Sequence, residues 1–412
     1  MAAAVDVFTS RRAGLPGGPQ IQRLRDLALE RFGALGFPTT HNEAWRYTNL
    51  APHLKTDFAA PTEFDAVPEP LTADHYRLAF VNGRFAPEHS VLPQARGLRV
   101  GSVLEGGAIG SEAAFDDNAL VALNTALFED GALVEITDGA VIDKPIELYF
   151  LSSGPVATFP RNLIVAGRDS QAQIVEIYAG GDGFTNAVTE FAAAEGSVIE
   201  HYKYQQEGPA TLHFGMLAVR QANSTNFTSH NLALGAALAR NEIAVVLDGE
   251  GAECTLNGLY VTDGRQHVDN YTTLDHARPH SASHELYKGV LDGSSHAVFH
   301  GRIIVRPEAQ KTDAIQRNRN LLLSKSAVID TKPQLEIYAD DVKCTHGATV
   351  GQVDADAVFY LRSRGIPDAE ARALLTYAFT ADVVEKIKIE SIRTALRGEL
   401  FRRLAGRDAS QL

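Results

Sequence analysis

Ala132-Leu-Val-Glu-Ile136 is one of four short runs that decide the fold class, together with Ile146-Glu-Leu-Tyr-Phe150, Gln173-Ile-Val-Glu-Ile-Tyr178 and Ile243-Ala-Val-Val-Leu247. Each run is rich in β-branched or aromatic residues and is bounded by Gly, Asp or Asn, which is typical of β-strands. No helical pattern of ten to fifteen residues separates them, so a doubly wound α/β sheet fits poorly. The sequence therefore predicts a mainly β protein, built as a sandwich, a barrel or a parallel β-solenoid.

A faint internal similarity favours the solenoid. Three related runs are Asn257-Gly-Leu-Tyr-Val261, His300-Gly-Arg-Ile-Ile-Val305 and His346-Gly-Ala-Thr-Val350, and their glycines are separated by 43 and 46 residues. These intervals are close to twice a coil of about 22 residues, a length typical of stacked architectures. Chance remains an alternative explanation, because the chain contains 34 glycines.

Helical patterns occur at both ends of the chain. Apolar residues recur at intervals of three and four between residues 20 and 35, which predicts an amphipathic helix. After residue 363 the helical pattern returns, and Pro367 and Asp368 are suited to a helix start. We therefore expect a helical region in residues 1–75, a β core in residues 76–362 and a second helical region in residues 363–412.

Composition limits the possible partners and the compartment. The formal net charge of −13 disfavours binding to nucleic acid or to an anionic membrane. Cys254 and Cys344 are the only cysteines, too few for a disulfide framework. The chain has no readable secretory signal and no apolar run of about 18 residues, so we expect a cytoplasmic protein.

Signatures of the common enzyme classes are missing. The sequence contains no GxxxxGK[ST] loop, no GxSxG, no HExxH and no paired-cysteine motif. We therefore expect no nucleotide bound by a P-loop of this chain, and no catalytic residues.

Two groups of residues could bind metal. Six of the 14 histidines fall between His267 and His300, but their spacing defines no ligand set. In the run Val342-Lys-Cys-Thr-His-Gly347, a strand would direct Cys344 and His346 to one face, about 7 Å apart. A thiolate and an imidazole could hold iron if a partner supplied the remaining ligands. From spacing alone, the favoured interpretation is a small buried cysteine beside a turn histidine.

Three stretches resemble a known family: Phe37-Pro-Thr-Thr-His-Asn-Glu-Ala-Trp-Arg-Tyr-Thr48, Lys343-Cys-Thr-His-Gly-Ala-Thr-Val-Gly-Gln352 and Val358-Phe-Tyr-Leu-Arg-Ser-Arg-Gly365. They are similar to motifs of the SufB/SufD proteins of the SUF iron–sulfur cluster assembly machinery. The His-Gly-Ala run resembles the SufD branch, because the SufB branch typically has His-Glu-Ala there. Ala44 and His41 stand where charged residues are common in the family.

The resemblance implies a right-handed parallel β-helix that acts as a non-enzymatic scaffold. It implies partnership with SufB and with the ATPase SufC, and a nascent iron–sulfur cluster held transiently with SufB groups at His346 and, less directly, Cys344. A homodimer is possible when the chain is isolated. The alternatives are a self-sufficient iron-binding or carrier protein, or a β-helix enzyme acting on carbohydrate or transferring acyl groups.

The C-terminal helices are the expected docking region for SufC. Residues 362–407 contain ten basic and six acidic residues, a local charge of +4 in an acidic chain. Apolar residues at helical spacing add a surface for docking, and we expect Tyr377, Phe379 and Ile387 to lie near this contact. The alternative is that these helices only cap the open end of the solenoid.

Overall fold

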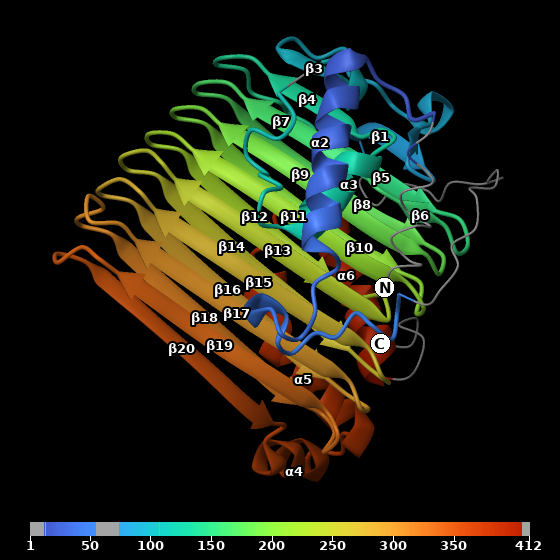
Figure 1. Ribbon diagram of the computed structural model, residues 1–412. Coiled ribbons are helices and arrows are strands. Elements are labelled where there is room, and N and C mark those ends of the chain that lie inside the picture. Colours follow the sequence, from blue (N-terminus) through green and yellow to red (C-terminus); the bar gives the residue numbers. More distant parts are fainter. Residues whose placement is uncertain (1–11, 13, 55–73, 107, 406–412) are drawn as a thin grey trace.

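The computed structural model describes residues 12, 14–54, 74–106 and 108–405, and it confirms the predicted fold class. The described chain forms a parallel β-helix in which two ten-stranded sheets lie face to face, with helices on their outer surfaces (Figure 1). The structure thus excludes the sandwich and the barrel.

The first sheet contains every second strand of the solenoid. Its order is β2 (Arg84–Phe85), β1 (Tyr76–Val81), β5 (Ile146–Ser152), β8 (Gln171–Gly180), β10 (Val198–Glu207), β12 (Asn226–Ala233), β14 (Glu253–Thr262), β16 (Ala282–Leu291), β18 (Asp313–Leu322) and β20 (Lys343–Gln352).

The second sheet contains the alternate strands. Its order is β19 (Val328–Ile337), β17 (His296–Val305), β15 (His267–His276), β13 (Leu238–Leu247), β11 (Leu212–Gln221), β9 (Phe184–Ala193), β7 (Arg161–Ala166), β4 (Ala132–Ile136) and β3 (Leu98–Ser102), while β6 (Ala157–Thr158) also pairs with β9. All pairs are parallel except β1 with β2 and β3 with β4.

One coil of the solenoid is about 30 residues long. Glu253, Ala282, Asp313 and Lys343 are successive Cα partners in the first sheet, so each step advances the numbering by 29, 31 or 30. The coil of about 22 residues expected from the glycine spacing is therefore wrong. Gly258 and Gly347 lie in the first sheet but Gly301 lies in the second, so their intervals do not measure a coil.

The period-two alternation of each strand divides its side chains between the interior and the outer faces. Along β13, Ala239, Ile243, Val245 and Leu247 point inward and join the main hydrophobic core. The inner face is not uniformly apolar, because strands such as β18 also bury the polar residues Gln316, Asn318 and Asn320.

Tight connections keep successive coils in register. Gly293 follows β16 with φ of +60°, a conformation that favours glycine. A Cβ atom there would also come within 2.6 Å of the backbone nitrogen of Gly264, in the equivalent turn one coil earlier. The stacking of these turns therefore requires a residue without a side chain.

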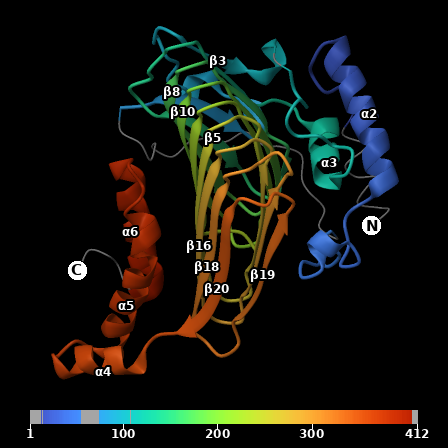
Figure 2. The ribbon, with the colours of Figure 1, turned by 90° about the vertical axis from the view of Figure 1, so that its left-hand side faces the viewer.

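The helices cover the two outer faces (Figure 2). On the second sheet lie α2 (Pro19–Leu35) and α3 (Ala119–Leu127), and on the first lie α5 (Asp368–Val384) and α6 (Glu390–Ala405), preceded by α4 (Ala355–Ser363). Short 3₁₀ turns are η2 (Glu43–Trp45), η3 (Pro87–His89) and η4 (Val103–Glu105). Of the helices in the described ranges, none is both long and apolar enough to cross a bilayer.

These positions refine the expected division of the chain. The strands begin at Tyr76, but the last strand ends at Gln352 and α4 starts at Ala355, so residues 355–362 are helical. Parts of the expected N-terminal region, residues 1–11, 13 and 55–73, lie outside the described residues.

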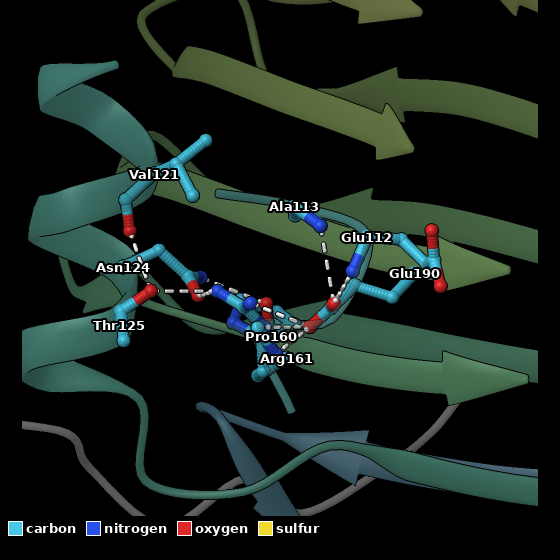
Figure 3. Close-up of polar contacts among 9 residues, drawn as sticks. Glu112, Ala113, Val121, Asn124, Thr125, Pro160, Arg161 and Glu190 are labelled. Atoms are coloured by element: carbon cyan, nitrogen blue, oxygen red, sulfur yellow. Dashed lines mark hydrogen bonds and ion pairs between the residues drawn. The ribbon is translucent and has the colours of Figure 1, made fainter. Parts of the chain in front are cut away.

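A buried ion pair fastens α3 and the loop before it to the second sheet (Figure 3). Arg161 and Glu190 are both fully buried, with Nη2 and Oε1 2.5 Å apart. Glu190 also accepts hydrogen bonds from the backbone N–H groups of Gly110, Glu112 and Ala113, and Arg161 donates to Thr125. Burial acts to raise the pKa of Glu190, but Arg161 and these amides hold it below its ordinary value.

Replacing Arg161→Met should therefore destabilise the fold by about 3–5 kcal/mol, because it leaves Glu190 buried and charged without its partner. Urea denaturation followed by circular dichroism measures this loss. Arg84→Met is the matched control, because the Arg84 side chain is 72% exposed in its ion pair with Glu129, and this pair should contribute less than about 1 kcal/mol. Equal losses in the two variants would contradict the account.

Candidate functional site

The solenoid ends in two strands that are hydrogen-bonded on one side only. Within the described residues, β20 pairs with β18 and β19 pairs with β17, and nothing continues either sheet. Lys343 N–H donates to the carbonyl of Thr312 at 2.8 Å, so alternation directs the backbone groups of Cys344, His346 and Ala348 away from β18. The last strand of the first sheet thus presents a row of unpaired donors and acceptors.

Cys344 and His346 lie on the inner face of this open strand, as the spacing predicted. Cys344 has Ala314 as its Cα partner and packs partly against the interior core. His346 has the buried Gln316 as its partner but is itself exposed, because no further coil covers it. The open end of the solenoid therefore displays a thiol and an imidazole side by side.

Partial burial changes the acidity of the Cys344 thiol. Partial burial, reinforced by the nearby charge of Asp313, raises the pKa of Cys344 above its ordinary value. The thiol therefore holds its proton more tightly than an ordinary cysteine, whereas His346 is exposed at the open end. Among the described residues, no three His, Cys, Asp or Glu side chains are grouped so that they could hold a metal ion.

A polar column runs inward from His346. Successive Cα partners in the first sheet are His346, Gln316 and Glu285, and Gln316 Nε2 donates to Glu285 Oε2 at 2.7 Å. Burial raises the pKa of Glu285 to about 7, although hydrogen bonds from Thr272 and Gln316 act in the opposite direction. The sequence analysis missed both residues, and only the coil length of about 30 residues would have aligned positions 285, 316 and 346.

A second polar group lies deeper inside the solenoid, around a cavity of about 20 Å³ that has room for about one water. Glu176 accepts a hydrogen bond from Tyr178 at 2.6 Å and lies 3.1 Å from the His201 Nε2. Burial lowers the pKa of Lys203 to about 8. Sequence reasoning also missed this group, since it is assembled from separate coils.

The residues expected to meet a partner on the C-terminal helices instead face the β-helix. Ile387 is fully buried in the cluster between these helices and the first sheet, and Tyr377 and Phe379 pack against the same cluster. Tyr377 stacks on Phe401, and Lys288 Nζ lies 4.8 Å from the Phe379 ring centroid. Their partner-binding role stays a prediction.

Exposed aromatic residues occur on α4, beside these helices. The exposed fractions of Phe359 and Tyr360 are 72% and 56%, unusually high for such large side chains. Both residues belong to the third motif of the sequence analysis, but the pattern alone did not mark them as the outward-facing pair. The helices lie along the face of the first sheet and leave its last strand open, so they do not cap the end of the solenoid.

The tryptophan motif is anchored to the second sheet. The Trp45 side chain is nearly buried, and the Arg240 guanidinium lies 4.0 Å above its ring. Thr48 donates to Asp269 at 2.6 Å, and Glu43 pairs with Lys332 of β19 at 2.7 Å. The motif therefore binds strands from β13 to β19 and fastens the N-terminal region to the last coil.

Fold and site together define a parallel β-helix protein whose final strand is open and carries a histidine and a cysteine on its inner face. Residues 149–379 match the family model described as "SUF system FeS cluster assembly, SufBD core domain", and residues 6–105 match that of the SufBD N-terminal region. The chain belongs to the SufB/SufD family of iron–sulfur cluster assembly proteins.

Relatives of known name agree with this assignment. The chain is 32% identical to the iron–sulfur cluster assembly protein SufD of Escherichia coli over 95% of this chain and 94% of the relative. It is 33% identical to the SufBD family protein slr0076 of Synechocystis, over 90% and 89% of the two chains. SufD of Bacillus subtilis is 30% identical over 70% of this chain and 68% of its own length. These matches confirm the resemblance to the SufD branch.

The raised pKa of Glu285 predicts that the stability of the fold depends on pH. Its folded pKa of about 7 exceeds the ordinary value of 4.5, so the unfolded chain ionises first and wild-type stability falls as the pH rises between these values. Relative to wild type, Glu285→Gln should gain up to about 3 kcal/mol between about pH 4.5 and pH 8.

Urea denaturation of both proteins at about pH 5 and pH 8 measures the effect. Glu253→Gln, which changes an exposed carboxylate on the neighbouring strand β14, is the control and should show no such trend. A wild-type and variant difference that is the same at both pH values would show that Glu285 does not titrate in this range.

Proposed function

We propose that this chain is the SufD-like scaffold subunit of a SUF complex, on which nascent iron–sulfur clusters are built and passed on together with SufB and the ATPase SufC. The observation that carries the proposal is the inner face of β20, where His346 and Cys344 lie at the open end of the solenoid. Family membership supports cluster assembly as the process, and the E. coli and B. subtilis relatives carry that function in their names.

The cluster is cargo shared between two chains in this proposal. Iron–sulfur clusters are usually held by about four protein ligands, whereas β20 offers one imidazole and one partly buried thiol. SufB would supply the remaining groups across the interface. His346 is the principal ligand from this chain, and Cys344 is a secondary one because its pKa is raised.

The open edge is the proposed contact with SufB. An unpaired strand binds another strand through its backbone, and the partner's side chains on the same face would then meet His346. Such pairing brings the two halves of a ligand set together without any large rearrangement. When SufB is absent, a second copy of this chain could pair at the same edge, which accounts for a possible homodimer.

The helical region is the proposed contact with SufC. Phe359 and Tyr360 of α4 offer exposed aromatic anchors of the kind that dominate binding energy, and the local charge of +4 favours an acidic partner surface. The contribution of Tyr377, Phe379 and Ile387 would be indirect. They would hold α5 on the first sheet, so that movement of SufC is transmitted to the β-helix.

His346→Ala should abolish cluster assembly and leave the complex with SufB and SufC intact, because His346 is exposed and its removal leaves no cavity. Anaerobic reconstitution with iron and sulfide, followed by absorbance of the cluster and size-exclusion chromatography, measures both properties. His89→Ala, a half-buried histidine at the far end of the first sheet, is the control. Normal assembly by the His346 variant would refute the ligand role, and loss of the complex would assign it a structural one.

Phe359→Asp should weaken SufC binding at least about tenfold, because it places a charge in an aromatic contact. Leu27→Asp is the matched control, since Leu27 is 59% exposed on α2, on the opposite face of the molecule. Isothermal titration calorimetry with purified SufC measures both. Equal affinity of the two variants and the wild type would place the SufC contact elsewhere.

A further inference from the structure

Gln316 lies directly inward of His346 and has one polar atom that is not used. The two residues are Cα partners on the adjacent parallel strands β18 and β20. Gln316 is only 1% exposed, and its Nε2 donates to Glu285. Its Oε1 has no hydrogen-bond partner among the described residues. A buried acceptor therefore remains free beside the open strand.

A free buried acceptor is unusual. Leaving one without a partner costs about 1–3 kcal/mol, and most buried polar groups in proteins are hydrogen-bonded. The opposite sheet nevertheless leaves space for this amide, because a Cβ atom on Gly301 would lie 2.3 Å from Gln316 Nε2. The bond to Glu285 accounts for the NH₂ group of Gln316, but the carbonyl oxygen of the same amide has no such explanation.

The direction of the amide is fixed by Glu285. When Glu285 is ionised it can only accept, so the NH₂ group of Gln316 faces Glu285 and its carbonyl oxygen is left for another neighbour. Across a strand spacing of about 4.8 Å, the next inward-facing side chain of the same column is His346.

We propose that Gln316 is a positioning residue. Its Oε1 has no partner within the part of the chain that the structure describes, and it accepts a hydrogen bond from one ring nitrogen of His346 when that exposed ring turns inward, which directs the other nitrogen toward the open edge. Metal-binding histidines usually donate their second ring N–H to a carbonyl or carboxylate, which fixes the tautomer and the ring orientation. The expected effect of Gln316 on cluster assembly rests on the proposed role of His346 as a cluster ligand.

The neighbouring column contains a buried amide with no free polar atom. Asn318, two residues along β18, has Ala348 as its partner on β20. Its amide group donates to Tyr260 at 3.1 Å, and its carbonyl oxygen accepts from Asn320 at 2.6 Å, so both ends are used. Asn318 thus provides a matched control that is buried on the same face of the same strand but does not lie behind a histidine.

The direct test is nuclear magnetic resonance of the full chain labelled with ¹⁵N-histidine at about pH 8, where Glu285 is mainly ionised. His346→Ala identifies the His346 signals. We expect a single tautomer in the wild type, with one ring N–H protected from solvent exchange, and a mixture of tautomers with fast exchange in Gln316→Met. Asn318→Leu should keep the wild-type pattern. Unprotected, mixed tautomers in the wild type overturn the proposal, whether or not the variants fold.

A second measurement separates this proposal from the function on which it rests. In reconstitution with SufB and SufC, Gln316→Met should assemble clusters about tenfold more slowly than Asn318→Leu. A changed ring signal together with an unchanged assembly rate overturns the positioning role. If His346→Ala itself assembles clusters normally while the wild-type hydrogen bond is present, the cluster-ligand function fails and the hydrogen bond stands.

Discussion

The parallel backbone ladder is the constraint on which the rest of the structure depends. From β5 to β18 every strand of the first sheet is bonded on both sides, so each coil is held by the ones before and after it. A repeating ladder must stop somewhere, and here it stops at β20 with half of its backbone groups unpaired. The same constraint that builds the β-helix therefore also leaves an open edge where it ends.

Register places the polar residues of the site in one column. Residues one coil apart lie side by side, so His346 is followed inward by Gln316 and Glu285. A buried carboxyl with a pKa of about 7 stabilises the fold less as the pH rises. The Trp45 motif contributes from outside, because its contacts reach β19 and hold the last coil to the N-terminal region.

The sequence was sufficient for the fold class and for part of the site. Alternation along Lys343–Gln352 placed Cys344 and His346 on one face correctly, because the period of two is a local property of any strand. The coil length was wrong because Gly301 belongs to the other sheet. Without the true register, Gln316 and Glu285 could not be aligned with His346. Helical spacing likewise identified the apolar residues of the C-terminal region, but it could not tell that Ile387 faces the β-helix while Phe359 faces outward.

Hydrogen–deuterium exchange at β20, with and without SufB, tests the central claim most directly. The amides of Cys344, His346, Ala348 and Val350 face away from β18, so they should exchange quickly in the isolated monomer and become protected when SufB binds. Exposed amides on α2, on the outer surface of the second sheet, serve as the internal reference and should not change. A stable complex in which the four β20 amides exchange as fast as before would contradict the account.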